Sequence, residues 1–128
     1  MKPIKLSIEG VFSYRKKQII DFEKLSTGGV FGIFGKTGSG KSSIIEAIIF
    51  VLYLRLEKIS GRLVDLINLQ SDKAVIEFEF ESFGKQYLAT SITKRIKGGQ
   101  TTKRTFYEKE DGNYRAVSED RTLECIIG

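Results

Sequence analysis

The sequence contains no histidine and a single cysteine among its 128 residues. The absence of histidine weakens any case for histidine-based catalysis or for a zinc site. Cys125 cannot form an internal disulfide. Its apolar neighbours Ile126 and Ile127 are typical of a small buried side chain in a reducing compartment.

Long apolar runs are also missing. No stretch approaches the roughly 20 apolar residues of a membrane-spanning helix. The longest run, residues 44–54, is interrupted by Glu46 and fits a buried helix better. The chain starts Met1-Lys2-Pro3 and alternates at once, so no signal peptide is expected. The net charge of +5 indicates nucleic acid only weakly, and the length favours one compact unit without a membrane segment.

The first half of the chain combines short strands with one helix. Alternation predicts a half-buried strand over residues 2–9, and residues 18–22 read as a returning strand after a polar turn. Residues 30–34 predict a short strand with both faces covered. Residues 42–55 are apolar on nearly every side, which predicts a helix at the centre of the fold.

The second half is different. Residues 57–72 form a polar-rich connection with a short helical turn expected around residues 63–69. Apolar and polar residues then alternate, which predicts antiparallel hairpins with one solvent-exposed face. Ser118 is expected to cap a final short helix. The strands are expected over residues 74–81, 86–96 and 101–108, with turns at 82–85, 97–100 and 111–113. One helix among so many strands does not fit a doubly wound domain.

A glycine-rich motif separates the strand at 30–34 from the helix. It matches G-x-x-x-x-G-K-[ST] at every fixed position. Glycines allow several backbone N–H groups to converge on a polyphosphate, and the following helix adds its unpaired N–H groups and positive dipole end. A chance glycine-rich turn is the alternative, but both flanks favour a phosphate site. The predicted nucleotide-binding residues of this P-loop are Gly35, Lys36, Thr37, Gly38, Ser39, Gly40, Lys41, Ser42 and Ser43.

Two of these residues have particular chemical roles. Lys41 is the predicted catalytic residue, since its ammonium group would reach the β- and γ-phosphates, and the Ser42 hydroxyl would ligate Mg²⁺. The N-K-x-D motif of GTPases is absent, and no run of four apolar residues ends in Asp. The nearest approach, Ile19-Ile20-Asp21, precedes the P-loop. Residues 25–29 faintly resemble the signature of ABC ATPases, but they lead into a strand and are interpreted as a turn.

Several short stretches together resemble the start of an SbcC-type protein, the ATPase subunit of the bacterial SbcCD nuclease and an SMC-like relative of ABC ATPases. They are residues 2–6, Phe12-Ser13-Tyr14-Arg15, Ile20-Asp21-Phe22, the P-loop, Ile45-Glu46-Ala47-Ile48 and Leu52-Tyr53. The resemblance covers roughly the first 55 residues, while the hairpin region matches in pattern only. It implies an α/β P-loop NTPase fold: the N-terminal part of an ABC/SMC-type ATPase head, with mixed and antiparallel strands around one buried P-loop helix.

The resemblance also implies a division of residues 1–128 and a longer natural chain. Residues 1–56 would form the P-loop core, 73–117 the antiparallel hairpin region, and 118–128 the start of a helix leading to a missing glutamine loop. A long coiled coil and a C-terminal half with the signature motif, the Mg²⁺-binding Asp and the catalytic Glu would follow. This fragment alone is therefore expected to hydrolyse ATP negligibly.

The implied function is that of a DNA-repair ATPase in the cytoplasm, associated with the nucleoid. ATP and Mg²⁺ would hold two ATPase heads together as a homodimer, and hydrolysis would control access of an SbcD-like nuclease subunit to double-stranded DNA ends. Two alternatives remain open. One is a head of another SMC-like or RecF-like ATPase, and the other is a stand-alone nucleotide-binding module without hydrolysis.

Two further groups of residues each have two interpretations. By resemblance, Ser13 and Arg15 lie in a segment that contacts the ribose or base of the nucleotide, although a plain polar hairpin turn explains them equally well. The basic residues of one predicted hairpin either contact DNA phosphates or form a solvated rim, which is the commoner case. They are Lys94, Arg95, Lys97, Lys103 and Arg104.

Overall fold

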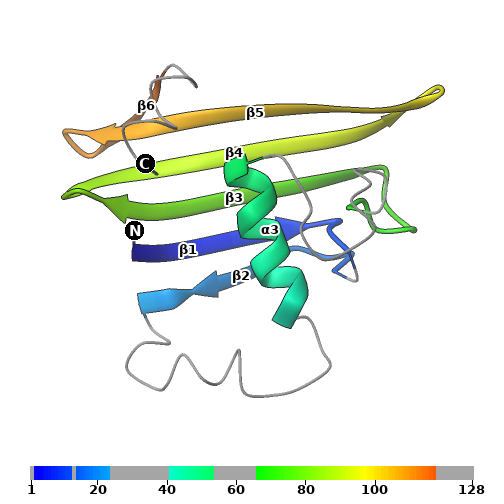
Figure 1. The fold of residues 1–128 in the computed structure, drawn as a ribbon, viewed down its shortest axis with the longest axis horizontal. Coiled ribbons are helices and arrows are strands. Elements are labelled where there is room, and N and C mark those ends of the chain that lie inside the picture. The colour runs from blue at the N-terminus through cyan, green and yellow to red at the C-terminus, as the bar shows by residue number, and fades with distance from the viewer. Residues whose placement is uncertain (1, 13, 24–40, 54–65, 118–128) are drawn as a thin grey trace.

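The computed structural model describes residues 2–12, 14–23, 41–53 and 66–117. These residues form a six-stranded sheet and a helix that lies across it (Figure 1). The elements are β1 (Lys2–Glu9), β2 (Gln18–Asp21), α3 (Lys41–Tyr53), β3 (Lys73–Ser82), β4 (Lys85–Ile96), β5 (Gly99–Glu110) and β6 (Asn113–Val117).

Within the described residues all strand pairs are antiparallel, and the strand order is β2-β1-β3-β4-β5-β6. The predicted strands over 2–9, 18–22, 74–81, 86–96 and 101–108 are confirmed, with ends that differ by two residues at most. Strand β1 lies between β2 and β3, so that Leu6 is opposite both Ile20 and Phe78. The N-terminal strands and the hairpin region therefore form one continuous sheet. The predicted strand at 30–34 and the predicted final helix lie outside the described residues.

Two of the hairpins use the same tight turn. Phe83 and Gly84 have φ angles of 52° and 79°, and Asp111 and Gly112 have 52° and 83°. Two consecutive positive φ values connect antiparallel strands with the twist that the sheet requires. The predicted turns at 82–85 and 111–113 are confirmed, as is the turn at 97–100, where Gly98 has a φ of 84°.

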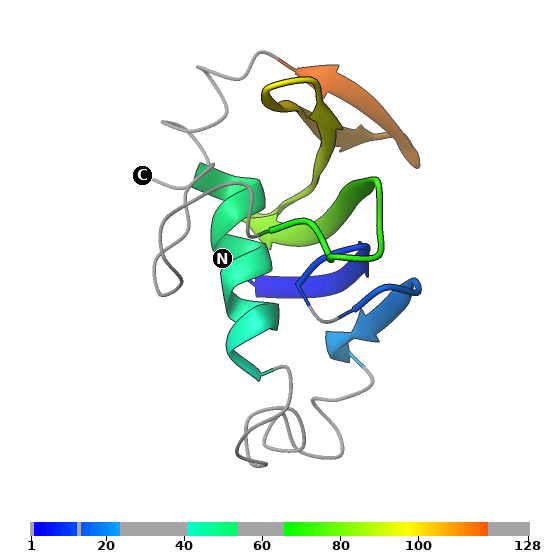
Figure 2. The same ribbon diagram turned by 90° about the vertical axis from the view of Figure 1, so that its right-hand side faces the viewer.

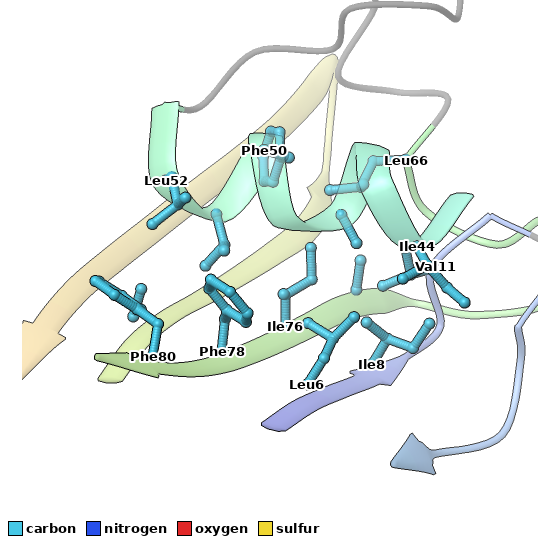
Figure 3. Packing of buried hydrophobic residues seen from close by; sticks show 14 of the residues in the cluster. Leu6, Ile8, Val11, Ile44, Phe50, Leu52, Leu66, Ile76, Phe78 and Phe80 are labelled. Atoms are coloured by element: carbon cyan, nitrogen blue, oxygen red, sulfur yellow. The ribbon is translucent and has the colours of Figure 1, made fainter. Parts of the chain in front are cut away.

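Helix α3 covers one face of the sheet (Figure 2). The alternation of β3 determines which face is covered, because Ile76, Phe78 and Phe80 are fully buried while the intervening glutamates are only half-buried. Figure 3 shows these side chains pointing toward those of the helix. Burial of each such side chain contributes roughly 1.5–3 kcal/mol relative to exposure. The apolar helix predicted over 42–55 is thus confirmed over Lys41–Tyr53, and residues 54–55 lie outside the described part.

The helical turn predicted around 63–69 is wrong for residues 66–69. The carbonyl oxygen of Leu66 accepts a hydrogen bond from the Phe12 N–H at 2.8 Å, and Ile67 forms an antiparallel bridge with Val11. These backbone groups bond to a distant segment. The local bond from the Ser71 N–H to the Asn68 carbonyl, at 2.9 Å, closes a turn over residues 68–71 that does not continue into a helix. Residues 63–65 lie outside the described part.

Candidate nucleotide-binding site

Helix α3 begins at Lys41, inside the glycine-rich motif. The backbone of Lys41, Ser42 and Ser43 therefore belongs to the first helical turn, whose N–H groups have no partners within the helix. No acidic residue lies in that turn, so no carboxylate there competes with an anion for the positive helix end. The remaining P-loop residues, Gly35, Lys36, Thr37, Gly38, Ser39 and Gly40, lie outside the described part.

The packing of α3 on the sheet holds this helix end in place. Ala47, Phe50 and Val51 are fully buried, and Ile44, one turn after the motif, is 7% exposed. A rigid helix transmits the position of its buried face to its first turn. The sheet therefore determines where the end of the motif lies.

The other end of α3 is bonded to β5. The guanidinium of Arg104 donates from Nη1 to the carbonyl oxygen of Leu52 at 2.7 Å and lies 4.9 Å from the centroid of the Phe106 ring. A cation at the C-terminus of a helix satisfies a free carbonyl and interacts favourably with the negative dipole end. The solvated-rim interpretation is therefore wrong for Arg104, which is half-buried and bonded to α3, whereas its contact with DNA stays a prediction.

The stretch around Ser13 and Arg15 forms a tight turn, called here the 10–15 turn. The N–H groups of Val11 and Tyr14 each donate to the carbonyl of the other, at 3.0 and 2.8 Å. Gly10 has a φ of 68°, and a Cβ atom there would collide with the carbonyl oxygen of Lys73. Only glycine fits this position without displacing the backbone. Arg15 is exposed at the end of the turn, and Ser13 lies outside the described residues.

Residues 66–72 lie alongside this turn, which sequence reasoning did not predict. Besides the bond from Phe12 to Leu66, the Asn68 N–H donates to the carbonyl of Gly10 at 2.8 Å, and the Asn68 side-chain amide donates to the carbonyl of Phe12 at 2.6 Å. The guanidinium of Arg15 donates to Oε1 of Gln70 at 3.0 Å. No local pattern in residues 57–72 indicates these contacts, because most of them use backbone groups of another segment.

An open cavity of about 580 Å³ lies at this junction. Its charged lining is mostly basic, with four cationic side chains against two carboxylates, so the cavity favours an anionic or strongly polar ligand. It is lined by Glu9, Gly10, Arg15, Gln70, Ser71, Asp72, Lys73, Lys94 and Arg95.

The basic hairpin of β4 and β5 divides into two groups. Arg95 donates to backbone carbonyls of Ile67, Asn68 and Ser71. It is therefore largely engaged within the protein, as Arg104 is. Lys94 and Lys103 are exposed on the sheet face opposite to α3, and Lys97 is exposed at the turn.

The described residues contain no group of three or more histidine, cysteine, aspartate or glutamate side chains that could hold a metal ion. The predicted Mg²⁺ ligand is Ser42, of which the structure describes the backbone. A hydroxyl in the first turn of a helix suits Mg²⁺, which takes oxygen ligands and usually completes its shell with waters and substrate phosphates. In the same described part, no helix is long and apolar enough to span a membrane.

Comparison with known proteins places the chain in a class. A family model described as an AAA domain matches residues 5–125, and the chain therefore belongs to the AAA domain family. The structure is similar to the SMC head domain from Thermotoga maritima, with a TM-score of 0.54 and 23% identity over 97% of this chain and 41% of that chain. This similarity confirms the predicted fold class, the N-terminal part of an SMC-type ATPase head.

Individual relatives indicate the type of ATPase more specifically than the family model does. The chain is 50% identical over 80 residues to the SbcC subunit of the nuclease SbcCD of Bacillus subtilis, covering 62% of this chain and 7% of that protein. It is 32% identical over 125 residues to a probable DNA double-strand break repair Rad50 ATPase of Aquifex aeolicus, an alignment that covers 96% of this chain and 11% of that protein. The predicted resemblance to the N-terminal part of SbcC-type ATPases is confirmed. The chain spans about a tenth of the length of these relatives.

Proposed function

We propose that this chain is the ATP-binding part of the head of an SbcC-type DNA-repair ATPase. The observation that supports this most strongly is the P-loop motif running directly into α3, with the helix held on the sheet by its buried face. Within that head we propose the division into residues 1–56, 73–117 and 118–128. The SbcC and Rad50 relatives support the same assignment.

In this proposal ATP lies across the N-terminus of α3. The backbone N–H groups of Gly35 to Ser43 hold the phosphates, the Lys41 ammonium neutralises charge on the β- and γ-phosphates, and the Ser42 hydroxyl binds Mg²⁺. Mg²⁺ would supply further charge neutralisation between the same phosphates. The 10–15 turn, with Ser13 and Arg15, lies against the ribose or base.

In the full-length protein, two heads would form a homodimer around ATP and act with an SbcD-like nuclease subunit on double-stranded DNA ends, in the cytoplasm at the nucleoid. Relatives named as subunits of an SbcCD nuclease support this pairing. Hydrolysis requires an apolar strand that ends in Asp and a signature motif. The sequence of residues 1–128 contains neither a run of four apolar residues ending in Asp nor a serine-glycine-glycine signature. We therefore expect negligible hydrolysis by this chain alone.

Calorimetric titration of the chain with Mg-ATP tests nucleotide binding. We expect Lys41→Ala to weaken ATP binding by tenfold or more, about 1.4 kcal/mol at the least, because a cation on two phosphates is removed. Lys97→Ala is the matched control, since it removes a lysine from an exposed turn and should leave the affinity unchanged. Equal affinities for the wild-type chain and Lys41→Ala would contradict the proposal.

The two alternatives predict different behaviour of the full-length protein. An SbcC-type protein should copurify with an SbcD-like nuclease and hydrolyse ATP. Another SMC-like or RecF-like head should hydrolyse ATP without that nuclease, and a stand-alone module should bind ATP without turnover.

A DNA contact on the β4–β5 hairpin is a second candidate function. It is supported by the exposure of Lys94, Lys97 and Lys103 along one hairpin, whereas Arg95 and Arg104 are directed to backbone carbonyls. Replacing all three lysines by alanine should weaken duplex binding by the full-length protein and lower the slope of log K against log salt by roughly three, about one for each phosphate contact. An unchanged slope would rule out this contact.

A further inference from the structure

Arg95 is an exposed basic residue whose hydrogen bonds go to the backbone of a single loop. Its Nε donates to the carbonyl oxygen of Ser71 at 3.3 Å, and Nη2 donates to those of Asn68 and Ile67 at 3.2 and 3.4 Å. Its own backbone N–H donates to the carbonyl of Asp72 at 3.2 Å. Together, these four bonds attach the end of β4 to residues 67–72.

The geometry of a guanidinium group explains why an arginine occupies this position. Its five N–H donors lie in one rigid plane and can serve several acceptors at once, whereas an ammonium group is a compact point charge on a flexible stem. Three carbonyls of one loop can converge on Arg95 only if the loop curves around it. The side chain therefore stabilises the curved shape of residues 67–72, together with the backbone bonds of Ile67 and Asn68 to the 10–15 turn.

Asn68 connects this loop to the 10–15 turn. Its side-chain amide donates to the carbonyl of Phe12 at 2.6 Å, and its Oδ1 accepts the N–H of Gln70 at 2.9 Å. Its backbone N–H donates to the carbonyl of Gly10 at 2.8 Å. One half-buried residue thus fixes both the turn and the backbone of Gln70.

Gln70 completes the connection to Arg15. The Arg15 guanidinium donates to Oε1 of Gln70 at 3.0 Å, although both side chains are exposed. A free arginine side chain carries about 2 kcal/mol of rotamer entropy that any ligand contact would have to overcome. Holding Arg15 in advance lowers that cost, which is the usual benefit of preorganisation.

We propose that Arg95 and Asn68 are positioning residues for the nucleoside end of the bound nucleotide. They hold the 10–15 turn and Arg15 in the arrangement that meets the ribose or base, and they touch neither the phosphates nor Mg²⁺. This inference rests on the proposed function, in which the P-loop binds the triphosphate separately. It predicts that the contributions of the triphosphate and of the nucleoside to affinity can be separated by mutation.

The test compares two ligands on the full-length protein, Mg-ATP and magnesium tripolyphosphate, which has no nucleoside. We expect Arg95→Ala and Asn68→Ala each to raise the Kd for ATP about tenfold, equivalent to about 1.4 kcal/mol. The Kd for tripolyphosphate should stay within about twofold of the wild-type value, since the phosphate site is not involved. Arg95→Lys keeps the charge without the planar donors and should remain closer to Arg95→Ala than to the wild type.

Arg115→Ala is the matched control. Arg115 is an exposed arginine paired with Glu110 at 3.0 Å on β5 and β6, so its loss should change neither affinity. Because Arg95 is itself exposed, its replacement should leave the protein folded, and unchanged tripolyphosphate binding verifies this directly.

The remaining outcomes separate the two proposals. Equal losses of affinity for ATP and tripolyphosphate would mean a general structural effect. An unchanged affinity for ATP would mean that the two residues have no positioning role. Either result would overturn the inference. If Lys41→Ala weakens both ligands while Arg95→Ala and Asn68→Ala weaken neither, the proposed function stands and only this inference fails. If wild-type protein binds no ATP, the proposed function fails and the inference with it.

Discussion

The two ends of the sheet are built in different ways. At one end, β3–β4 and β5–β6 are joined by bare two-residue turns, Phe83–Gly84 and Asp111–Gly112. At the opposite end, which also carries the two-residue turn Lys97–Gly98, the loop after β1 lies beside the loop before β3 (Figure 1). There the 10–15 turn, residues 66–72 and Arg95 form a junction of three segments joined by side-chain and backbone hydrogen bonds. The bare turns only reverse the chain, whereas the junction holds groups from distant parts of the sequence at defined positions.

The largest difference in stability between the two ends is expected when a glycine in each of them is replaced by alanine. Gly10→Ala introduces a Cβ that collides with the Lys73 carbonyl at a positive φ, and we expect it to lower the free energy of unfolding by about 3 kcal/mol. Gly84→Ala is the control, because φ is again positive but no atom lies within 4 Å of the new Cβ. It should cost only about 1 kcal/mol. Urea denaturation of both variants measures the difference, and equal costs would contradict it.

The next largest effect is expected at Arg104, which lies between the two ends. Arg104→Ala leaves the Leu52 carbonyl without this donor and removes the cation from the Phe106 ring, so we expect a loss of about 2 kcal/mol in urea denaturation. Arg115→Ala breaks only an exposed pair and should cost less than about 0.5 kcal/mol. Similar losses in the two variants would show that the contact with α3 adds nothing.

A substitution in the β3–β4 turn should raise the free energy of unfolding, not lower it. Phe83 is 84% exposed and has a φ of 52°, a backbone region in which aromatic residues are strained and asparagine is favoured. Phe83→Asn should therefore raise the free energy of unfolding by roughly 0.5 kcal/mol or more. Asp111→Asn, in the same kind of turn, should change it little. A lower melting temperature for Phe83→Asn would mean that the exposed ring makes a stabilising contact.

The smallest effect concerns pH. Partial burial, with a smaller contribution from the Glu79 carboxylate, raises the pKa of Tyr114 above its ordinary value. The folded protein therefore holds the phenolic proton more tightly than the unfolded chain does. This stabilisation is present below about pH 10 and is lost as the pH rises through the folded pKa. Tyr114→Phe should weaken the fall in stability above about pH 10, and identical pH profiles for variant and wild type would contradict this.

Sequence patterns predicted the elements far better than the contacts between them. Alternation identified β3 because Ile76, Phe78 and Phe80 all point to one face, and the P-loop motif located the start of α3 within one residue. The roles of Arg95 and Arg104 could not be predicted in this way. Both donate to backbone carbonyls of distant segments. Because every residue has a backbone carbonyl, no sequence motif indicates which carbonyl accepts such a bond. The pairing of β1 with β3 was hidden for a similar reason, since the P-loop and α3 separate them in the chain.

That pairing has a consequence for how the protein is made. Strand β1 leaves the ribosome early, with only β2 available as a neighbour, while its other partner, β3, is translated after α3. At about 5–20 residues per second, β1 waits several seconds with one edge unpaired. Strands β3 to β6, in contrast, are sequential hairpins that can form locally. Strand β1 can therefore pair with β3 only after α3 has been translated. The same pairing brings Gly10 to the Lys73 carbonyl, so the contact of the 10–15 turn with β3 forms later than the pairing of β1 with β2.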